Sequence, residues 1–318
     1  MKRCLLAAAM AALLASYARG QDSLLTDGLV LATFRDARSL GVDPAGRIYV
    51  ADAGRHAVRI MDRQGRTVFE LGGAGTEEAE FDEPRGVDPT NGLAIVVADA
   101  GNSRLKRFTR SYQLIESIRL YGDGPDPVGA GSPSESLVAR GAGRALPVGR
   151  PIAVAVSRSN EIFAVDELQS AVGKWNASRQ FVGFIGAEND FVRLKEPVDI
   201  EVLGDLVMVA DRRLQSIAVY DQFGGYVTEF GGGRLVGLSG LYATEELVAA
   251  AFGSRVAFFD RTGMLLGDFP LPVRRPVRDV ALLGDRLLVL TERELIAFPL
   301  PSLAAARKSD VDPQTERR

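Results

Sequence analysis

The sequence predicts an all-β protein built from six copies of a four-stranded unit, and three observations predict it. Short apolar runs end in an aspartate at Asp52, Asp99, Asp166 and Asp211, which lie 47, 67 and 45 residues apart. Each run is bounded by Gly, Asn or Pro turns and alternates with the period of a strand, not of a helix. Two weaker copies follow them. A period near 45 residues with four strands per unit is typical of a β-propeller blade, so we predict a six-bladed β-propeller with antiparallel blades.

The elements of each unit follow one order. A Pro or Gly introduces the innermost strand, as at Pro84, Pro151, Pro197 and Pro276. The second strand ends at the repeated aspartate. The third strand ends in one large apolar or aromatic residue per unit, namely Met61, Phe108, Trp175, Tyr220, Phe259 and Phe298. A Gly turn then leads to a fourth strand, as at residues 66–71 and 226–230. We expect Trp175, at the position equivalent to Phe108 and Tyr220, to be a core residue.

The sixth unit ends at Leu300 without a fourth strand of its own. Residues 27–34, which precede the first unit, have the pattern of the missing strand. We therefore expect the N-terminal strand to complete the last blade. Closure of this kind removes the two open sheet edges that a linear array would expose.

Residues 1–20 have the pattern of a secretory signal peptide. Lys2 and Arg3 precede an apolar stretch at 5–15, and small residues at Ala18 and Gly20 mark a cleavage site before Gln21. We predict export to the periplasm or beyond, with a propeller at 21–303, an insertion at 121–149 between the second and third blades, and a charged, disordered tail at 304–318. The single cysteine, Cys4, lies in the leader, so packing and not disulfides must stabilise the mature chain.

Composition excludes several classes of partner. Without Lys2, Arg3 and Arg19, the 38 basic residues fall to 35 against 41 acidic residues, a net charge of −6. A mildly acidic chain has no overall field to attract nucleic acid, so we expect no nucleic-acid partner. Nothing runs apolar for the eighteen or more residues of a membrane-spanning helix, so we expect no membrane insertion. We expect a monomer.

One segment gives a specific resemblance. Residues 97–108 read Val-Ala-Asp-Ala-Gly-Asn-Ser-Arg-Leu-Lys-Arg-Phe, which resembles the NHL repeat, with Asn102 and Arg104 on the Asn and Arg positions of that family. In the first unit His56 falls on the family's His position. The resemblance implies a six-bladed ring that acts as a ligand- or protein-binding platform, although a few relatives are enzymes. The amidating lyases among them use zinc held by several histidines, and His56 is the only histidine here.

The four repeated aspartates are interpreted as structural. One carboxylate per blade at the same strand end places Asp52, Asp99, Asp166 and Asp211 around a ring, too far apart to share a metal ion. Aspartate side chains commonly accept hydrogen bonds from the backbone of their own turn. We expect each of them to cap its loop.

A basic face is the main functional prediction. In an antiparallel blade, the loop after the second strand and the connection between blades emerge on the same face. That face receives the candidate binding residues Arg85, Arg104, Arg150, Arg212, Arg213 and Arg275. It could gather a protein partner or a small anionic ligand, without catalytic residues or a cofactor. The alternative is that these arginines only pair with nearby acidic residues such as Glu83 and Glu196.

A channel metal is the second hypothesis. Asp199 and Asp279 lie near the start of innermost strands, at positions that we align with Gly41, Gly86 and Ala153. Together with Glu201 they could hold Ca²⁺ through oxygen ligands. The resemblance extends to lactonase and gluconolactonase propellers, which hold a calcium there with Glu, Asn and Asp, but the aligned strands offer no clear Asn. The alternative function is therefore a calcium-dependent lactonase-like hydrolase.

Overall fold

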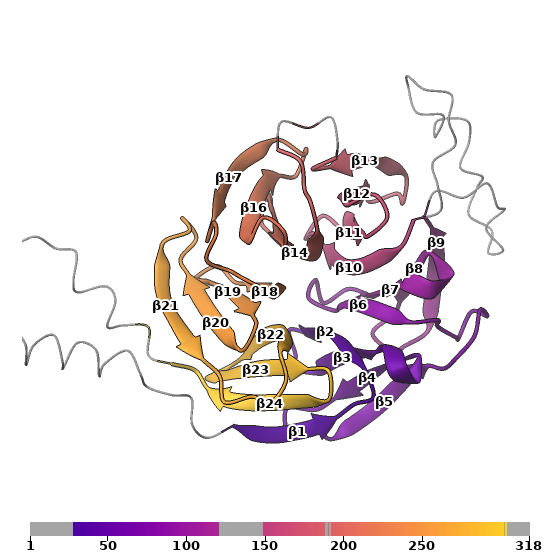
Figure 1. Ribbon diagram of the computed structural model, residues 1–318. Coiled ribbons are helices and arrows are strands. Elements are labelled where there is room, and N and C mark those ends of the chain that lie inside the picture. The colour runs from indigo at the N-terminus through magenta and orange to yellow at the C-terminus, as the bar shows by residue number, and fades with distance from the viewer. Residues whose placement is uncertain (1–27, 121–148, 188–189, 191, 302, 304–318) are drawn as a thin grey trace, which may run out of the picture.

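The structure, a computed structural model, describes residues 28–120, 149–187, 190, 192–301 and 303. Within these residues, 24 strands form six four-stranded sheets arranged as a ring around a central axis (Figure 1). The sequence prediction of a six-bladed, antiparallel propeller is confirmed. The leader at 1–20, the insertion at 121–148 and the tail at 304–318 lie outside the described residues. No helix of the described part is long and apolar enough to cross a membrane.

The first three blades follow one another along the chain. Blade 1 contains β2 (Ala37–Val42), β3 (Ile48–Asp52), β4 (Ala57–Met61) and β5 (Thr67–Gly72). Blade 2 contains β6 (Pro84–Asp88), β7 (Ile95–Asp99), β8 (Arg104–Phe108) and β9 (Leu114–Arg119). Blade 3 contains β10 (Pro151–Val156), β11 (Ile162–Asp166), β12 (Ala171–Trp175) and β13 (Phe181–Ile185). Two 3₁₀ turns, η1 (Ala53–Arg55) and η2 (Ala100–Asn102), follow the second strands of blades 1 and 2.

The remaining blades have the same order. Blade 4 contains β14 (Pro197–Leu203), β15 (Leu206–Asp211), β16 (Ser216–Asp221) and β17 (Tyr226–Phe230). Blade 5 contains β18 (Leu238–Ala243), β19 (Val248–Phe252), β20 (Arg255–Phe259) and β21 (Leu265–Pro270). Blade 6 contains β22 (Val277–Leu283), β23 (Arg286–Thr291) and β24 (Glu294–Pro299), and β1 (Leu29–Thr33) is its outermost strand.

Pairing between β1 and β24 closes the ring. Leu29 lies opposite Ala297 and Val30 lies opposite Ile296 in an antiparallel register. Figure 1 shows the two strands, from opposite ends of the chain, side by side in one sheet. The predicted closing strand is therefore confirmed.

The hydrophobic core lies between blades and not within them. Six clusters of buried side chains each join one blade to its neighbour around the ring. Phe81 and Phe108, for example, pack in the joint between blades 1 and 2, and Trp175 packs between blades 2 and 3. Trp175 is buried, as expected, and so are the corresponding third-strand residues of the other blades. Because a single sheet has no core of its own, each blade depends on both neighbours.

One irregularity recurs in all six blades. The pairing between the innermost and second strands shifts register at the second residue of the innermost strand. A bulge leaves its extra residue outside the ladder and can change the direction of its side chain. The six bulge residues are Arg38, Arg85, Ile152, Val198, Ser239 and Arg278.

The bulge corrects one alignment made from the sequence. Ser39 pairs with Ala51 of β3 in the same way that Asp199 pairs with Ala210 of β15. The blade 1 counterpart of Asp199 is therefore Ser39, and the alignment with Gly41 was wrong. The remaining aligned residues, Gly86 and Ala153, occupy the equivalent place in blades 2 and 3.

The innermost strands of neighbouring blades approach closely where the residue after the bulge is a glycine, as in blades 2 and 5. A Cβ on Gly240 would lie 2.6 Å from the Cα of Asp279, and one on Gly86 would lie 2.9 Å from the Cα of Ala153. A side chain at either position would push two blades apart.

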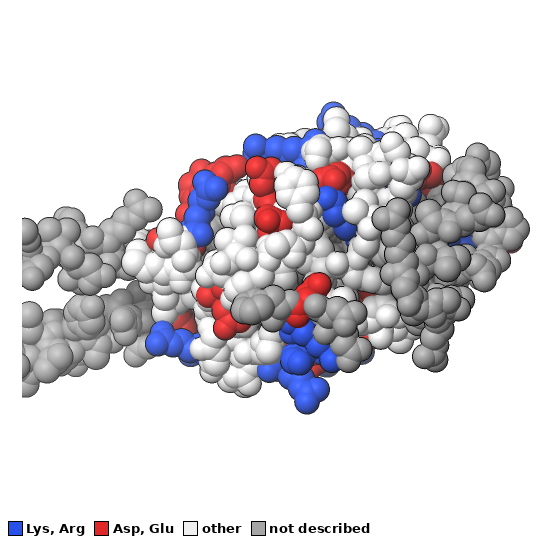
Figure 2. Space-filling view, turned by 90° about the horizontal axis from the view of Figure 1, so that it is seen from above, with Lys and Arg blue, Asp and Glu red and all other residues white. Residues whose placement is uncertain are grey.

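Seen from its edge, the ring carries acidic and basic side chains next to one another on the side facing the viewer (Figure 2).

Candidate functional site

The central channel opens into a cavity at each end. A cavity of about 310 Å³ lies where the innermost strands begin, among the loops after the second strands and the connections between blades. We call it the loop-rich mouth. A cavity of about 430 Å³ lies at the other end, among the turns between the first and second strands. We call it the hairpin mouth.

All six bulge residues line the loop-rich mouth. Blades 6, 1 and 2, which are consecutive around the ring, contribute Arg278, Arg38 and Arg85. Blades 3, 4 and 5 contribute Ile152, Val198 and Ser239 at the same position. One half of the mouth is therefore cationic, and the other half is apolar or neutral.

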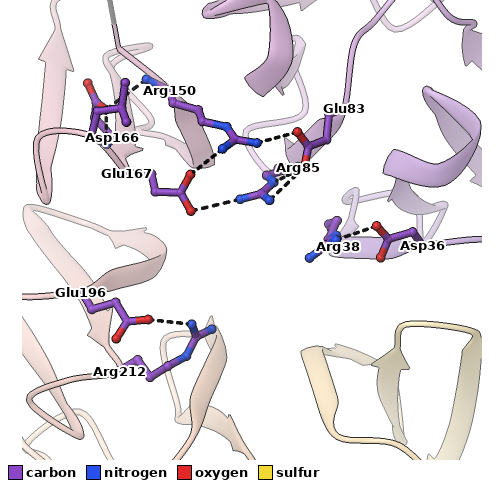
Figure 3. Close-up of polar contacts among 10 residues, drawn as sticks. Asp36, Arg38, Glu83, Arg85, Arg150, Asp166, Glu167, Glu196 and Arg212 are labelled. Carbon is purple, nitrogen blue, oxygen red and sulfur yellow. Dashed lines mark hydrogen bonds and ion pairs between the residues drawn. The ribbon is translucent and has the colours of Figure 1, made fainter. Parts of the chain in front are cut away.

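A four-residue ion-pair network covers one side of this mouth (Figure 3). Arg85 contacts Glu83 at 2.8 Å and Glu167 at 3.2 Å. Arg150 contacts the same two carboxylates at 2.5 Å and 3.1 Å. Burial acts to raise the pKa of Glu83, but the guanidinium groups of Arg85 and Arg150 outweigh it and lower that pKa. The network joins blade 3 to the connection between blades 1 and 2.

Arg212 lies across the cavity from Arg85 and is also paired (Figure 3). It contacts Glu196 at 2.9 Å and donates from Nε to the carbonyl of Leu238 at 3.1 Å. Of the six candidate binding arginines, the structure thus brings Arg85 and Arg212 to the mouth and holds Arg150 beside it.

The other three candidates lie away from the mouth. Arg104 donates to the Asp99 carboxylate at 2.7 Å and to the carbonyls of Glu77 and Glu80. Arg275 lies 3.8 Å from Glu292. The side chain of Arg213 is exposed, and its guanidinium makes no hydrogen bond or ion pair within the described residues; only its backbone N–H is bonded, to Asp211. It borders a separate surface cavity with Lys195 and Arg193. Most of the basic face is thus neutralised by acidic neighbours.

Sequence reasoning missed Arg38 and Arg278, which are the least committed cations of the mouth. Arg38 pairs with Asp36, but its Nε is buried and has no hydrogen-bond partner in the described structure. The side chain of Arg278 has one ion pair, at 4.0 Å to Glu292, and no hydrogen bond to a described residue. The signal that could have found them is an arginine as the second residue of an innermost strand, shared with Arg85.

Deeper in the channel, carboxylates tie neighbouring innermost strands together. Asp199 accepts hydrogen bonds from the N–H groups of Ile200 at 2.9 Å and of Leu241, in the next blade, at 2.7 Å. Asp279 does the same with Val280 at 2.8 Å and Leu40 at 2.7 Å.

Similar bridges occur at two further joints. Asp88 accepts a hydrogen bond from Val156 N–H at 2.6 Å, and Ser39 Oγ accepts one from Val87 N–H at 3.3 Å. Four of the six joints between blades are bridged in this way.

Burial changes the acidity of these channel groups. It raises the pKa of Asp199 to about 7. It also raises the pKa of Asp279, with the nearby Asp199 acting in the same direction. The pKa of Glu201 is raised well above its ordinary value, first by burial and then by Asp88, Asp199 and Asp279. The channel therefore favours protonated carboxyls over several adjacent negative charges.

These carboxyls do not present a ready set of metal ligands. Both oxygens of Asp199 and both of Asp279 already accept backbone N–H groups. Glu201 lines the hairpin mouth, at the other end of the channel from the strand starts. No group of three or more His, Cys, Asp or Glu side chains in the described residues is placed to hold a metal ion. The arrangement does not fit the calcium predicted for Asp199, Glu201 and Asp279.

Comparison with known proteins supports the repeat assignment. The NHL repeat family model matches residues 34–61, which run from the start of blade 1 to the end of its third strand. The structure around the matched residues is a six-bladed ring with the strand order expected for such repeats. This chain is an NHL-repeat β-propeller. No curated protein sequence matches it.

Solved structures similar to this NHL-repeat propeller have diverse functions. A gluconolactonase from Xanthomonas campestris is 16% identical with a TM-score of 0.61, covering 88% of this chain and 92% of that one. Virginiamycin B lyase from Staphylococcus aureus is 12% identical with a TM-score of 0.57, covering 83% and 80%. Hydrazine synthase from Kuenenia stuttgartiensis is 14% identical with a TM-score of 0.56, covering 80% and 74%. At these identities the likeness shows the fold alone.

The repeat motif of this NHL-repeat propeller is built around its aspartate. Asp99 accepts hydrogen bonds from Asn102 Nδ2 at 2.9 Å and Arg104 Nε at 2.7 Å, so the motif's Asn and Arg both hold one carboxylate. Asp99 also accepts the N–H of Asp82, in the connection that enters the blade, at 2.7 Å. His56 has a left-handed backbone, and its Nδ1 accepts the N–H of Glu83.

The other repeated aspartates make similar contacts. Asp52 accepts the N–H groups of Arg35 and Asp36 from the connection that enters blade 1. Asp166 and Asp211 accept N–H groups both from such a connection and from their own loop. All four are buried. These carboxylates thus join two loops of a blade, a wider role than capping one turn.

Proposed function

We propose that this NHL-repeat propeller is an exported, non-catalytic binding scaffold whose loop-rich face docks a protein or a small anionic ligand. One observation carries the proposal: a cavity at the channel mouth is lined by Arg38, Arg85, Arg212 and Arg278. Guanidinium groups held around one opening suit the recognition of carboxylate or phosphate groups. The rigid ring behind them holds their positions.

The electrostatics of the mouth support binding over acid–base chemistry. Arg85 and Arg150 lower the pKa of Glu83 and keep it ionised and paired. A general base works best when its pKa lies near the working pH, and a carboxylate held by two arginines is a poor proton acceptor. The network therefore supports a structural and recognition role.

Export is the part of the proposal that rests on the leader at 1–20. Signal cleavage near Gly20 leaves Gln21 as the first residue of the mature chain. N-terminal sequencing of protein recovered from the periplasm or medium should begin at Gln21. Recovery of a full-length chain from the cytoplasm alone would contradict export.

Charge reversal on the loop-rich face tests docking. The variant Arg212→Glu/Arg213→Glu changes that face, and Arg158→Glu/Arg261→Glu makes the matched change around the hairpin mouth, where Glu245 pairs with both residues. Cross-linking in the native cell envelope should capture a partner with the wild type and the control pair but not with Arg212→Glu/Arg213→Glu. Equal capture by all three proteins, each folded by circular dichroism, would refute docking through this face.

The calcium-dependent lactonase-like hydrolase has one observation in its favour. Asp199, Glu201 and Asp279 lie near enough to one another for their charges to raise the pKa of Glu201. The hydrogen bonds described above argue against a metal at this place, so this alternative stays a prediction. Calcium that raises the melting temperature by several degrees would support it through binding linkage, and no change would count against it.

A further inference from the structure

We propose that Arg38 and Arg278 bind the carboxylate of an acid whose apolar body packs against Ile152 and Val198 on the opposite half of the loop-rich mouth. This inference rests on the proposed function and names the chemistry of its ligand. It follows from which side chains of the mouth are already paired and which are not.

Arg278 lies in a region with more positive than negative charge. Glu292 is its ion-pair partner at 4.0 Å, and the same carboxylate is shared with Arg275 at 3.8 Å and Arg293 at 2.9 Å. Three guanidinium groups around one carboxylate leave a positive surplus. An anion entering the cavity next to Arg278 would therefore meet an attractive field.

Arg38, from the adjacent blade, supplies unsatisfied donors. Its Nη2 contacts Asp36 at 2.5 Å, but its Nε is buried without a hydrogen-bond partner within the described structure. A buried donor without a partner is costly, and such a group in a native structure calls for an explanation. The Arg38 side chain lines the cavity and is 27% exposed, so a ligand oxygen could reach its remaining Nη donors even though Nε itself is buried.

The other cations of the mouth are less available. Glu83 and Glu167 hold three N–H groups of Arg85, and Glu196 together with the Leu238 carbonyl holds Arg212. Ser239 donates its hydroxyl proton to the carbonyls of Val277 and Ala251. The anion should therefore bind on the side formed by blades 1 and 6.

The opposite half of the cavity suits an apolar group. Ile152, Val198 and Pro197 line it, and the first two are bulge residues like Arg38. A volume of about 310 Å³ lies at the lower end of the range of small-molecule pockets, roughly 300–1,000 Å³. The site therefore fits a short acid or the last residue of a chain.

A single negative charge fits better than a double one. Glu167 and Glu196 also line the cavity and would repel a second charge on the ligand. A planar guanidinium pairs well with the two oxygens of a carboxylate. The carboxylate could come from a free acid or from the C-terminus of a protein.

Hexanoate, its uncharged analogue hexanamide, and inorganic phosphate are the first probes. Isothermal titration with the mature chain should show hexanoate binding at least tenfold more tightly than either of the other two. Equal binding of hexanamide would refute the role of charge. Tighter binding of phosphate would refute the monocarboxylate assignment.

Variants then locate the site. Arg278→Gln removes no hydrogen bond to a described residue, so it should fold, and it should weaken hexanoate binding at least tenfold. Arg38→Gln/Arg278→Gln should weaken it further, while Arg158→Gln/Arg261→Gln at the hairpin mouth should leave it unchanged. Folded Arg278→Gln protein that binds hexanoate as tightly as wild type would overturn the proposal.

A peptide ending in Leu, with its terminus free or amidated, separates the two sources of carboxylate. Preference for the free peptide over hexanoate assigns a protein terminus, and the reverse preference assigns a free acid. If neither carboxylate binds, the inference fails. Capture of a partner that is lost in Arg212→Glu/Arg213→Glu would still uphold the proposed function in that case.

Discussion

The carboxylate of Asp279 accepts a hydrogen bond of 2.7 Å from the backbone N–H of Leu40, 239 residues away in the sequence. The contact joins the innermost strand of blade 6 to that of blade 1, the joint at which the ring closes. Its second oxygen accepts the N–H of Val280 at 2.8 Å. One buried side chain thus satisfies donors from both sides of the closure.

The first prediction follows from this contact. Asp279→Ala leaves two backbone N–H groups without an acceptor, so it should lower the free energy of unfolding by about 2–4 kcal/mol. Asp205→Ala, at an exposed turn, should change it by less than about 0.5 kcal/mol. Urea denaturation monitored by circular dichroism measures both variants. If Asp279→Ala unfolds at the same urea concentration as the wild type, the Asp279 bridge contributes nothing to ring closure.

The second prediction concerns pH and Asp199. Its pKa in the folded chain is about 7 against an ordinary value of 3.8, because burial disfavours the charged form. Between these two pH values, Asp199 keeps its proton in the folded state but has released it in the unfolded chain. Its contribution to the free energy of unfolding is therefore full below about pH 4 and is lost as the pH rises to 7. The loss amounts to at most about 4 kcal/mol.

Asp199→Asn has no proton to lose and isolates this effect. It gives up one acceptor for a backbone N–H, which should cost about 1 kcal/mol at every pH. The difference between wild type and variant should nevertheless shift in favour of the variant from pH 4.5 to pH 8. Urea unfolding across this range measures it. Parallel stability curves would show that Asp199 does not titrate between these values.

The third prediction compares two aspartates with similar bonds and different burial. Asp211 is fully buried and accepts N–H groups from the connection at Lys195 and from its own loop at Arg213. Asp221 accepts two turn N–H groups in an exposed setting. Asp211→Ala should cost about 3 kcal/mol, and Asp221→Ala should cost about 1 kcal/mol or less, because water can replace the lost acceptor only at the exposed turn. Thermal and urea unfolding measure the loss of stability in both variants. Equal losses in Asp211→Ala and Asp221→Ala would refute this prediction.

The fourth prediction tests the closing strand. Deletion of residues 24–34 removes β1 and exposes the edge of β24, so the product should aggregate or fail to fold. Size-exclusion chromatography and calorimetry measure the outcome. A soluble, monomeric product with an unchanged melting temperature would show that the ring does not need the strand.

The sequence was sufficient for the ring because its signals are local. Turn residues mark the strand ends, the repeated aspartates recur once per unit in four of the units, and residues 27–34 have the pattern of the missing strand. Each of these follows from backbone preference and burial within a few residues. The register of the innermost strands was less accessible, because a bulge of one residue is decided by pairing with the neighbouring strand.

The site was harder to predict for the same reason. Arg85 was expected to be available, yet it is held by Glu167 from another blade, and no sequence spacing indicates such a pair. Arg38 and Arg278 were missed although they share the bulge position of Arg85, because no pairing pattern in the sequence shows that this position faces the mouth in every blade. Nor did the sequence show that Asp199 and Asp279 bridge blades, since their partners Leu241 and Leu40 donate only backbone N–H groups.

The repeated bulge places one side chain per blade at the loop-rich mouth without a partner in the strand ladder. Arg38 and Arg278 form no ladder pair at the bulge, and neither side chain belongs to a buried core cluster, whereas the strands on either side of them hold the sheets together. If the loop-rich mouth binds the proposed carboxylate, its selectivity could therefore change at Arg38 and Arg278 while the architecture stays intact. Those two codons define a compact library for testing that dependence.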